Sequence, residues 1–401
     1  MVRPVLLDMT RAAARRWNGA QPTGIDRVCD AYARHFTQKA IAVIQIRGRA
    51  VILNRAASDN LMLSLDASRG TFRRTLAASL TMSAAAPIRR NETLDAFYIN
   101  VGHSDFDLDA HWRWIRKRQL KPVYLLHDLI PITNPDVTTA HKSARHRGRV
   151  VSAIANAAGL VVNSQTTAKA LTGFARKSAL PMPPMLVSLI ASGPLPRVRR
   201  HPVRKKTLFL SIGTVEHRKN PLLLLRVWSE LLDRMGDATP RLVLAGSLGQ
   251  GSEEVLRVLA GNPALAEVVS IRSDLDDHGM ARLLAQSRAV LLPSLAEGYG
   301  IPLVEALERG VPVIGSNLES FRELSQGIST LLDPTDHLAW LEAVLDCIRE
   351  GQEYRRQSDT LHRFNPPSWS QHFSMLERWL DQLQYESAHS GGPDDLLAAV
   401  A

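Results

Sequence analysis

Short runs of hydrophobic residues alternate along the chain with longer stretches in which apolar positions recur every three or four residues. The short runs are typical of strands buried on both faces of a parallel sheet, and the longer stretches are typical of amphipathic helices. In the first half, the predicted strands are Val5–Asp8, Ala42–Ile46, Ala96–Asn100, Pro122–Leu126, Gly159–Val162 and Leu186–Ile190. The clearest helical patterns between them are Asp26–Phe36 and Ala140–Ala157.

The same alternation begins again near residue 207. The predicted strands there are Thr207–Ile212, Arg241–Ala245, Val268–Ile271, Ala289–Leu292 and Pro312–Ile314. The predicted helices between them are Pro221–Met235, Ser252–Leu259, Gly279–Gln286 and Pro302–Glu308. Between the two halves, Pro194–Lys206 combines prolines with basic residues and fits neither period, which predicts an interdomain linker.

Strands that alternate with helices predict an α/β chain with two doubly wound, Rossmann-like domains facing each other across a cleft. The predicted domains are residues 1–200 and 201–365. A helix within 366–386, centred on Ser368–Leu383, is expected to pack back across the domains, and 387–401 to form a flexible tail. Ligands of such sheets bind beyond the carboxyl ends of the strands, so the loops that follow strands are the places to search for chemistry.

Composition excludes several classes of protein. The chain has 401 residues, of which 45% are hydrophobic and seven are Trp, so it is not a disordered protein. Cys29 and Cys347 are too few for a disulfide framework or a zinc-ligand set. We expect a cytoplasmic protein that is neither exported nor membrane-spanning, because no apolar stretch has the length of a signal peptide core or a transmembrane helix.

The net charge of +10 is unevenly distributed: residues 1–200 carry +18 and residues 201–401 carry −8. A pI near 9.9 suggests nucleic acid as a partner, but the chain has no recognisable nucleic-acid-reading motif, and we predict no such partner. The uneven distribution of charge indicates instead a basic domain that faces an anionic partner and an acidic domain with another function.

The segment Pro293–Ser316 has the clearest candidate chemistry. A buried strand ends, a loop with two glycines follows, and Pro302 stands where a helix would begin. Glu297 precedes the loop and Glu305 lies inside the helix, with seven residues between them. Carboxylates and the backbone N–H groups near Tyr299, Gly300 and Ile301 at a helix start can together bind sugar hydroxyls. Taken singly, each glutamate is more often an ordinary solvated charge.

A second segment, Leu208–Leu225, predicts a strand, a loop and a helix. Gly213 lets the backbone approach a ligand, and Arg218 and Lys219 stand before Asn220 and Pro221, which resemble an N-cap and a first helical position. Two cations at a helix N-terminus suit a diphosphate, whose charge they can neutralise without a metal ion. Alone, an Arg-Lys pair is more often merely solvated.

His127 follows the predicted strand Pro122–Leu126 and so lies at its carboxyl end. A neutral imidazole there can hydrogen-bond a sugar hydroxyl or orient an acceptor without serving as a base. A histidine at a strand end is, without other context, more often structural.

Two other patterns in the sequence suggest a metal site and a dinucleotide site. Asp105, Asp107 and Asp109 alternate in the manner of a metal-binding motif, but they are more simply the N-cap and first turn of the next helix, and we predict no metal site. The glycines of Gly246–Gly251 are in the wrong order for a dinucleotide fingerprint, so no cofactor is expected.

Two basic patches in the first half suit the headgroup layer of an anionic membrane. One combines cations with tryptophans: Trp112, Arg113, Trp114, Arg116, Lys117, Arg118 and Lys121. The other is Lys142, Arg145, Arg147 and Arg149. The alternative is that these are solvated helix faces with Trp112 and Ile115 turned inward.

These residues together resemble glycosyltransferase family 4, which consists of retaining enzymes of GT-B fold. The resemblance rests on the segment Pro293–Ser316 above all, and on Thr23–Val28, Tyr124–Ile132, Val162–Thr167, Ser211–Asn220 and Leu244–Gln250. It implies that Glu297 contacts the donor sugar, Glu305 the ribose, and Arg218 with Lys219 the diphosphate. It further implies that Gly24 faces the pyrophosphate and that His127 meets the sugar or acceptor. Many relatives have an arginine where Thr214 stands, so Arg218 is expected to supply that charge.

The predicted function is retaining transfer of a hexose, of which mannose is one candidate, from a nucleotide-diphosphate sugar to a surface polysaccharide or lipid-linked glycan. The predicted location is the cytoplasm, peripherally at the inner face of the cell membrane. The alternative is a non-catalytic nucleotide-sugar-binding or membrane scaffold of the same fold. Such a scaffold is expected to have lost a member of the set Glu297, Glu305 and Lys219, and all three are present.

Overall fold

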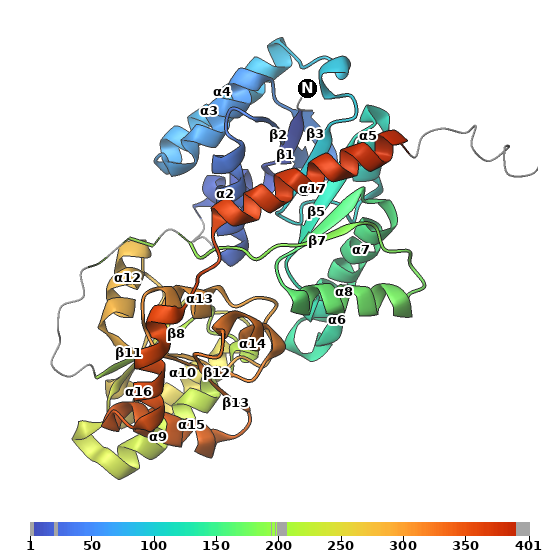
Figure 1. Cartoon of the computed structure of the whole chain (residues 1–401). Helices are drawn as coiled ribbons and strands as arrows, with labels where there is room; N and C mark the ends of the chain where they lie inside the picture. Colours follow the sequence, from blue (N-terminus) through green and yellow to red (C-terminus); the bar gives the residue numbers. More distant parts are fainter. Residues whose placement is uncertain (1–3, 20–22, 194, 197, 199–206, 390–401) are drawn as a thin grey trace, which may run out of the picture. The chain divides into compact units, whose positions relative to one another are not determined.

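The computed structural model describes residues 4–19, 23–193, 195–196, 198 and 207–389 (Figure 1). The chain divides into two compact units. The first comprises Met1–Thr133, Thr139–Ile190 and Ser368–Ala401, and the second comprises Asn134–Thr138 and Ala191–Pro367. Most of the predicted linker and the end of the predicted tail, 390–401, lie outside the described residues, so the domain boundaries near 200 and 365 and the flexible tail stay predictions.

The first unit is built on a seven-stranded sheet, as far as its residues are described. Its strands are β1 (Val5–Asp8), β2 (Ala40–Ile46), β3 (Arg49–Ile52), β4 (Phe97–Asn100), β5 (Lys121–Leu126), β6 (Gly159–Val162) and β7 (Met185–Val187). The strand order is β3-β2-β1-β4-β5-β6-β7, and all neighbours are parallel except β2 and β3. Its helices are α1 (Thr10–Asn18), α2 (Gly24–Phe36), α3 (Arg55–Leu63), α4 (Arg69–Ala85), α5 (Asp109–Arg118), α6 (Ile130–Thr133), α7 (Ala140–Asn156), α8 (Gln165–Lys177) and α17 (Trp369–His389).

All six strands predicted for this half are confirmed, although the last ends at Val187 instead of Ile190. The hairpin partner β3 was not predicted, because its four residues alternate between intermediate and exposed positions and are not a hydrophobic run. The helices α3 and α4 were missed as well. Half of the buried side chains of α4 are serines, Ser79 and Ser83, so the apolar period of this helix is weak.

The core of the first unit surrounds a buried polar network at the carboxyl end of β1. Asp8 accepts hydrogen bonds from the hydroxyl of Tyr98 and the amide nitrogen of Gln45, both at 2.7 Å. His111 contacts the amide oxygen of Gln45 at 2.7 Å and the hydroxyl of Tyr124 at 2.6 Å. Burial raises the pKa of Asp8 above its usual value, although these hydrogen bonds oppose the shift.

The tryptophans of α5 belong to this core and not to the surface. Trp112 is buried and donates its indole N–H to the carbonyl of Phe106 at 3.0 Å. The half-buried Trp114 packs edge-on against Tyr98, with 5.1 Å between ring centroids. The alternative interpretation, with Trp112 and Ile115 turned inward, is therefore the one that the structure confirms, so Trp112 is not exposed to a membrane surface.

The second unit is built on a six-stranded, fully parallel sheet in the described part of the chain. Its strands are β8 (Leu208–Ile212), β9 (Arg241–Ala245), β10 (Val269–Arg272), β11 (Ser287–Leu292), β12 (Val313–Ser316) and β13 (Thr330–Leu332), in the order β10-β9-β8-β11-β12-β13. Its α-helices are α9 (Pro221–Met235), α10 (Ser252–Gly261), α11 (Pro263–Val268), α12 (Asp277–Gln286), α13 (Ile301–Glu308), α14 (Glu319–Ser325), α15 (His337–Arg349) and α16 (Gln352–Thr360). Both sheets have the doubly wound order expected for a Rossmann-like domain.

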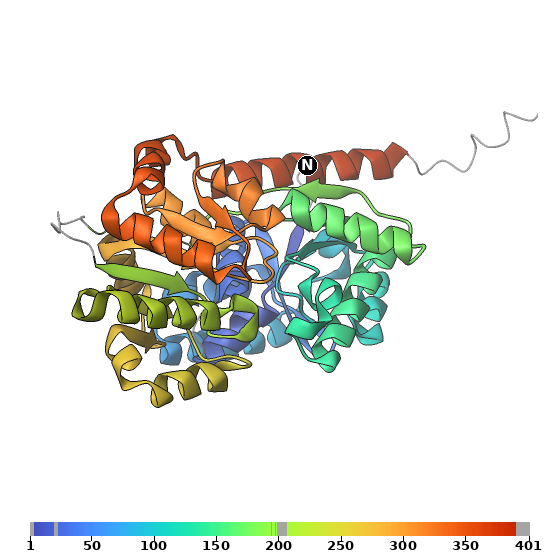
Figure 2. The ribbon, with the colours of Figure 1, turned by 90° about the horizontal axis from the view of Figure 1, so that it is seen from below.

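The last helix, α17, returns the chain to the first unit, and Figure 2 shows it along one side of that unit. His372 contacts the hydroxyl of Tyr32 at 2.7 Å and that of Ser188 at 2.9 Å. Phe373 stacks on His35 with 3.9 Å between ring centroids. The helix predicted within 366–386 is thus present and packs on the first unit. No helix in the described residues is both long and apolar enough to cross a membrane.

The packing of α17 leaves no room for a side chain at Gly159, the first residue of β6. A Cβ atom there would lie 2.5 Å from Cη2 of Trp379 and 3.0 Å from Cδ1 of Leu383. We predict that Gly159→Ala lowers the free energy of unfolding by about 1–3 kcal/mol and makes α17 more sensitive to proteases, because overpacking forces the helix outward.

The matched control is Gly148→Ala inside α7, where a Cβ atom would meet nothing within 4 Å. This substitution is expected to be neutral or to stabilise the protein by up to about 1 kcal/mol, because it restricts the unfolded chain. Urea denaturation and limited proteolysis of both variants measure the difference. Equal behaviour of the two variants would show that α17 does not pack as described.

Candidate functional site

The site forms where the loops after β8 and β9 pair with each other beyond the sheet. Gly213 N–H donates to the carbonyl of Ala245 at 3.0 Å, and Val215 N–H donates to that of Ser247 at 2.8 Å. Gly249 N–H then donates to the carbonyl of Val215 at 2.9 Å. These hydrogen bonds extend the parallel pairing of the two strands and fix the path of the β8 loop.

Two glycines permit this close approach. A Cβ atom on Gly246 would lie 2.1 Å from the carbonyl oxygen of Gly213, so no other residue fits there. Gly213 itself has φ +139°, and a Cβ atom on it would lie 3.1 Å from Cε of Lys219. The predicted approach of the Gly213 backbone to a ligand stays a prediction, and the structure shows instead that the missing side chain of Gly213 leaves space for Lys219.

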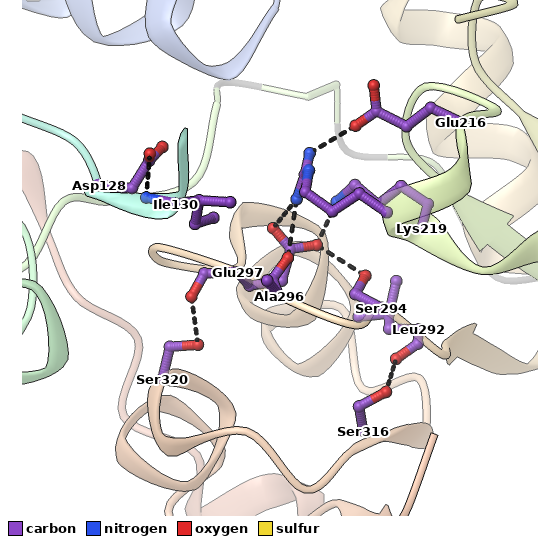
Figure 3. A network of polar contacts seen from close by, with 11 residues as sticks. Asp128, Ile130, Glu216, Lys219, Leu292, Ser294, Ala296, Glu297, Ser316 and Ser320 are labelled. Atoms are coloured by element: carbon purple, nitrogen blue, oxygen red, sulfur yellow. Dashed lines mark hydrogen bonds and ion pairs between the residues drawn. The ribbon is translucent and has the colours of Figure 1, made fainter. Parts of the chain in front are cut away.

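The β8 loop ends in the short 3₁₀ turn η4 (His217–Lys219), which brings Arg218 and Lys219 to Glu297 (Figure 3). Lys219 donates its ammonium Nζ to Oε1 of Glu297. Arg218 donates Nη1 to Oε2 of Glu297 at 3.0 Å and to the carbonyl of Ala296 at 2.8 Å. The structure thus brings together three of the four predicted catalytic residues, from loops that follow β8 and β11.

Further hydrogen bonds hold this cluster in place. Ser294 donates its hydroxyl to Oε1 of Glu297 at 2.8 Å, and Glu216 accepts Nη2 of Arg218 at 2.7 Å. The backbone N–H of Leu295 donates to the carbonyl of Arg218 at 2.8 Å. The two loops are therefore joined through both backbone and side chains, and these contacts restrict the movement of the two cations.

The carboxylate of Glu297 is nearly enclosed, with its side chain 10% exposed. Burial alone would raise its pKa, but Lys219 and Arg218 outweigh burial and lower the pKa to about 2. Glu297 is therefore ionised at neutral pH. Together with Glu216 it balances the charge of the two cations.

The residues predicted to bind the rest of the donor lie around the start of α13. Tyr299 is buried, Gly300 is the N-cap with φ +124°, and Ile301 is the first helical residue, one position before the predicted start at Pro302. Glu305 is only 4% exposed. A solvated helix charge would not be buried to this extent, so the alternative interpretation of Glu305 is wrong.

His127 and Gly24 belong to the first unit. His127 donates Nε2–H to the carbonyl of Val101 at 2.8 Å, since a carbonyl can only accept. Burial lowers the pKa of His127 to about 4, so its ring is neutral at physiological pH. Gly24 is the first residue of α2, directly after the N-cap Thr23, and Asp26 completes a capping box with Thr23. The meeting of His127 and Gly24 with the cluster around Glu297 stays a prediction.

The three aspartates weighed as a metal site each have a structural partner or position. Asp107 accepts hydrogen bonds from Arg145 at 2.8 Å and from Arg149 at 3.0 Å. Asp105 accepts the backbone N–H of Gly48 at 2.7 Å, and Asp109 opens α5. The expected aspartate N-cap is wrong in detail, because Leu108 is the N-cap residue. The described residues contain no group of three or more His, Cys, Asp or Glu side chains that could hold a metal ion.

Sequence reasoning missed Glu216 and Ser294. Glu216 lies two positions before Arg218, and Ser294 three before Glu297, so both fall within the segments already singled out. Their contacts depend on the path of the loop backbone, which hydrophobic periodicity does not report.

Residues 197–360 match the family model of the glycosyl transferases group 1. The chain is 31% identical over 118 residues to the serotype-specific mannosyltransferase WbdA of Escherichia coli, which is 29% of this chain and 14% of that protein. It is 32% identical over 162 residues to a phosphatidyl-myo-inositol mannosyltransferase of Mycolicibacterium smegmatis, 39% of each chain. These matches thus span less than half the length of either relative.

Two solved structures show the fold. Sucrose-phosphate synthase from Thermosynechococcus elongatus is similar with a TM-score of 0.61 at 14% identity, over 97% of this chain and all of that one. Anabaena HepE in complex with UDP-glucose is similar with a TM-score of 0.66 at 14% identity, over 95% of this chain and all of that one. The prediction of a GT-B fold with two Rossmann-like domains is confirmed, and the match of residues 197–360 agrees with the resemblance to family 4 glycosyltransferases.

The enclosed ion pair yields a stability prediction. We expect Lys219→Met and Glu297→Gln each to lower the free energy of unfolding, because each removes one charge from an enclosed cluster whose charges balance. The double variant should recover part of the loss, with a coupling energy of about 1–2 kcal/mol in urea denaturation. The exposed pair Glu230 and Arg234 on α9 is the matched control, and its coupling should stay below about 0.5 kcal/mol. Additive effects at Lys219 and Glu297 would contradict the described pair.

Proposed function

We propose that this chain, which carries a glycosyl transferases group 1 domain, is a retaining hexosyltransferase that uses a nucleoside-diphosphate sugar. The single observation behind the proposal is the convergence of Arg218 and Lys219 on the ionised carboxylate of Glu297. Mannose is the first candidate for the sugar, because the relatives above are named mannosyltransferases. The proposed acceptor is a surface polysaccharide or a lipid-linked glycan, and the name O-antigen chain mannosyltransferase B of another Escherichia coli relative supports this choice.

In the proposed reaction, Arg218 and Lys219 bind the donor diphosphate and exchange part of their contact with Glu297 for phosphate oxygens. Negative charge grows on the diphosphate as the bond to the anomeric carbon breaks, so fixed cations stabilise the transition state more than the bound donor. We propose that these two side chains suffice without a metal ion or cofactor. Their anchoring by Glu216 and the carbonyl of Ala296 keeps them oriented before the donor arrives.

Glu297 is proposed to accept hydrogen bonds from hydroxyl groups of the donor sugar, and Glu305 from those of the ribose. The backbone at Tyr299, Gly300 and Ile301 is proposed to line the donor site. Retention requires the acceptor oxygen to bond to the anomeric carbon on the face that the diphosphate leaves. In this step the acceptor hydroxyl loses its proton to the departing phosphate oxygen, so no protein nucleophile is needed. Glu297 then remains a carboxylate throughout.

His127 and Gly24 are proposed to complete the site from the first unit. His127 already donates Nε2–H to a backbone carbonyl, so its other ring nitrogen can accept a hydrogen bond from a sugar or acceptor hydroxyl. A pKa near 4 makes it a weak base at neutral pH, which suits a positioning role. Gly24 at the start of α2 is proposed to face the pyrophosphate.

We further propose that the protein is cytoplasmic and binds an anionic membrane surface peripherally through its basic first unit. Trp17 is 43% exposed, and the guanidinium of Arg73 lies 4.9 Å from its ring centroid. The helix α4 beside it contains Arg69, Arg73 and Arg74 and no acidic residue. An exposed tryptophan beside unopposed cations suits a phospholipid headgroup layer better than the buried tryptophans of α5 do.

The donor site is tested with purified protein and a panel of nucleotide sugars, GDP-mannose, UDP-glucose and UDP-N-acetylglucosamine among them. We expect release of nucleoside diphosphate from one of them, stimulated by a glycan acceptor, and an NMR spectrum of the product that shows the donor's anomeric configuration. Lys219→Ala and Glu297→Gln should each lower kcat by about 100-fold or more.

The control for these variants is Arg226→Ala, which removes an exposed cation from α9 and should leave turnover unchanged. Near-normal turnover in Lys219→Ala and Glu297→Gln would exclude the site. Donor binding by the wild type without any release of nucleoside diphosphate would favour the non-catalytic scaffold instead.

Membrane association is tested by cosedimentation with phosphatidylglycerol-containing vesicles. We expect binding that weakens with salt and that falls about tenfold or more in the double variant Arg69→Glu with Arg74→Glu, at roughly 1 kcal/mol per cation near the surface. Arg226→Glu with Arg282→Glu makes the same charge change in the second unit and should leave binding less affected. Equal loss in both double variants would argue against α4 as the contact.

A further inference from the structure

A cavity of about 290 Å³ lies in the second unit where η4, the start of α9 and the start of α10 meet. Its lining joins buried apolar residues, Pro221 and Val255, to exposed polar ones, among them Gln250 and Glu254. The cavity also reaches Glu216 and Arg218, which belong to the cluster around Glu297. None of the roles assigned above accounts for it.

The chemistry of the lining favours an uncharged ligand with many hydroxyl groups. The carboxylates of Glu216 and Glu254 can accept hydrogen bonds from hydroxyls, and the amide of Gln250 can both donate and accept them. The lining contains three carboxylates, Asp136, Glu216 and Glu254, against one guanidinium, Arg218, so its charge disfavours an anion. The apolar side chains of the lining, Pro221, Leu222 and Val255, suit the C–H face of a sugar ring, and its more numerous polar side chains suit the hydroxyl rim.

The size and position of the cavity narrow the choice of ligand further. Its volume stands at the lower end of the range for small-molecule sites, about 300–1,000 Å³, which fits a single sugar unit better than a nucleotide sugar. Arg218 lines the cavity and also bonds to Glu297, so a sugar in the cavity would be separated from the donor cluster by one side chain. A ligand held there would be next to the diphosphate without occupying its place.

We propose that this cavity is a subsite for an uncharged sugar unit of the acceptor glycan. The inference rests on the proposed function and deepens it, because it places acceptor recognition partly on the donor-binding unit. It also selects among acceptors: the carboxylates of Glu216 and Glu254 disfavour a uronic acid or other anionic sugar at this position.

The test uses the full chain without donor and follows saturation-transfer NMR signals of methyl α-D-mannoside, an α-linked mannobiose and glucuronate. The uncharged sugars should bind and glucuronate should not. Glu254→Ala should weaken their binding by about tenfold, the loss expected for a hydrogen bond to a charged group. Glu253→Ala is the matched control, because Glu253 is an exposed carboxylate in the same first turn of α10 but does not line the cavity.

Three outcomes would overturn the proposal: no binding of the uncharged sugars, equal weakening by Glu253→Ala and Glu254→Ala, or stronger binding of glucuronate. A fourth would reassign the cavity to the donor nucleoside, namely displacement of the sugar by UDP or GDP together with weaker nucleoside-diphosphate binding in Glu254→Ala. The proposed function is measured separately, by calorimetric titration of UDP and GDP into wild type and Lys219→Ala. If the titration shows no effect of Lys219→Ala, the proposed function fails, but the sugar-binding result can still be interpreted.

Discussion

The pairing of the loops after β8 and β9 is the constraint on which the site depends. Without the hydrogen bonds from Gly213 to Ala245 and from Val215 to Ser247, the path of the β8 loop would be open, and η4 would not present its cations to Glu297. The pairing needs Gly246, because any side chain there would collide with the carbonyl of Gly213. A backbone arrangement thus determines where two charges stand, and the charges in turn hold the loop that leads into α13.

This arrangement balances the charges of the cluster around Glu297. Two unpaired cations in a half-enclosed position would repel each other and would attract any available anion. Glu297 and Glu216 neutralise them, and burial of Glu297 does not protonate it because the cations outweigh the cost of burial. The cations are therefore oriented in advance, and little rearrangement is needed when another anion competes for them.

Much of this could be predicted from the sequence, and the exceptions have physical causes. The helix α9 begins and ends where Asn220, Pro221 and Met235 predicted, because a proline at the first helical position restricts the local conformation independently of tertiary packing. The convergence of Lys219 and Glu297 follows from the rule that functional loops gather at the carboxyl ends of parallel strands.

The sequence-based predictions failed where tertiary packing outweighs the local sequence pattern. For the α5 tryptophans the flanking cations left a surface and an inward position open, and the fold selects the inward one, with the rings against Tyr98 and Phe106. The helix α4 was missed because serines occupy positions where the sequence rule expects apolar residues. Glu216 was missed because its contact with Arg218 depends on a loop conformation imposed by a neighbouring loop.

The return of α17 to the first unit has a consequence for biosynthesis. The second unit is nearly continuous in sequence, whereas the first is completed only by residues that follow Pro367. During translation from the N-terminus, Tyr32, His35 and Gly159 must wait for His372, Phe373 and Trp379 to leave the ribosome. The first unit to begin synthesis is therefore the last to finish folding, and its exposed surface for α17 is the part of the nascent chain that most needs protection from aggregation.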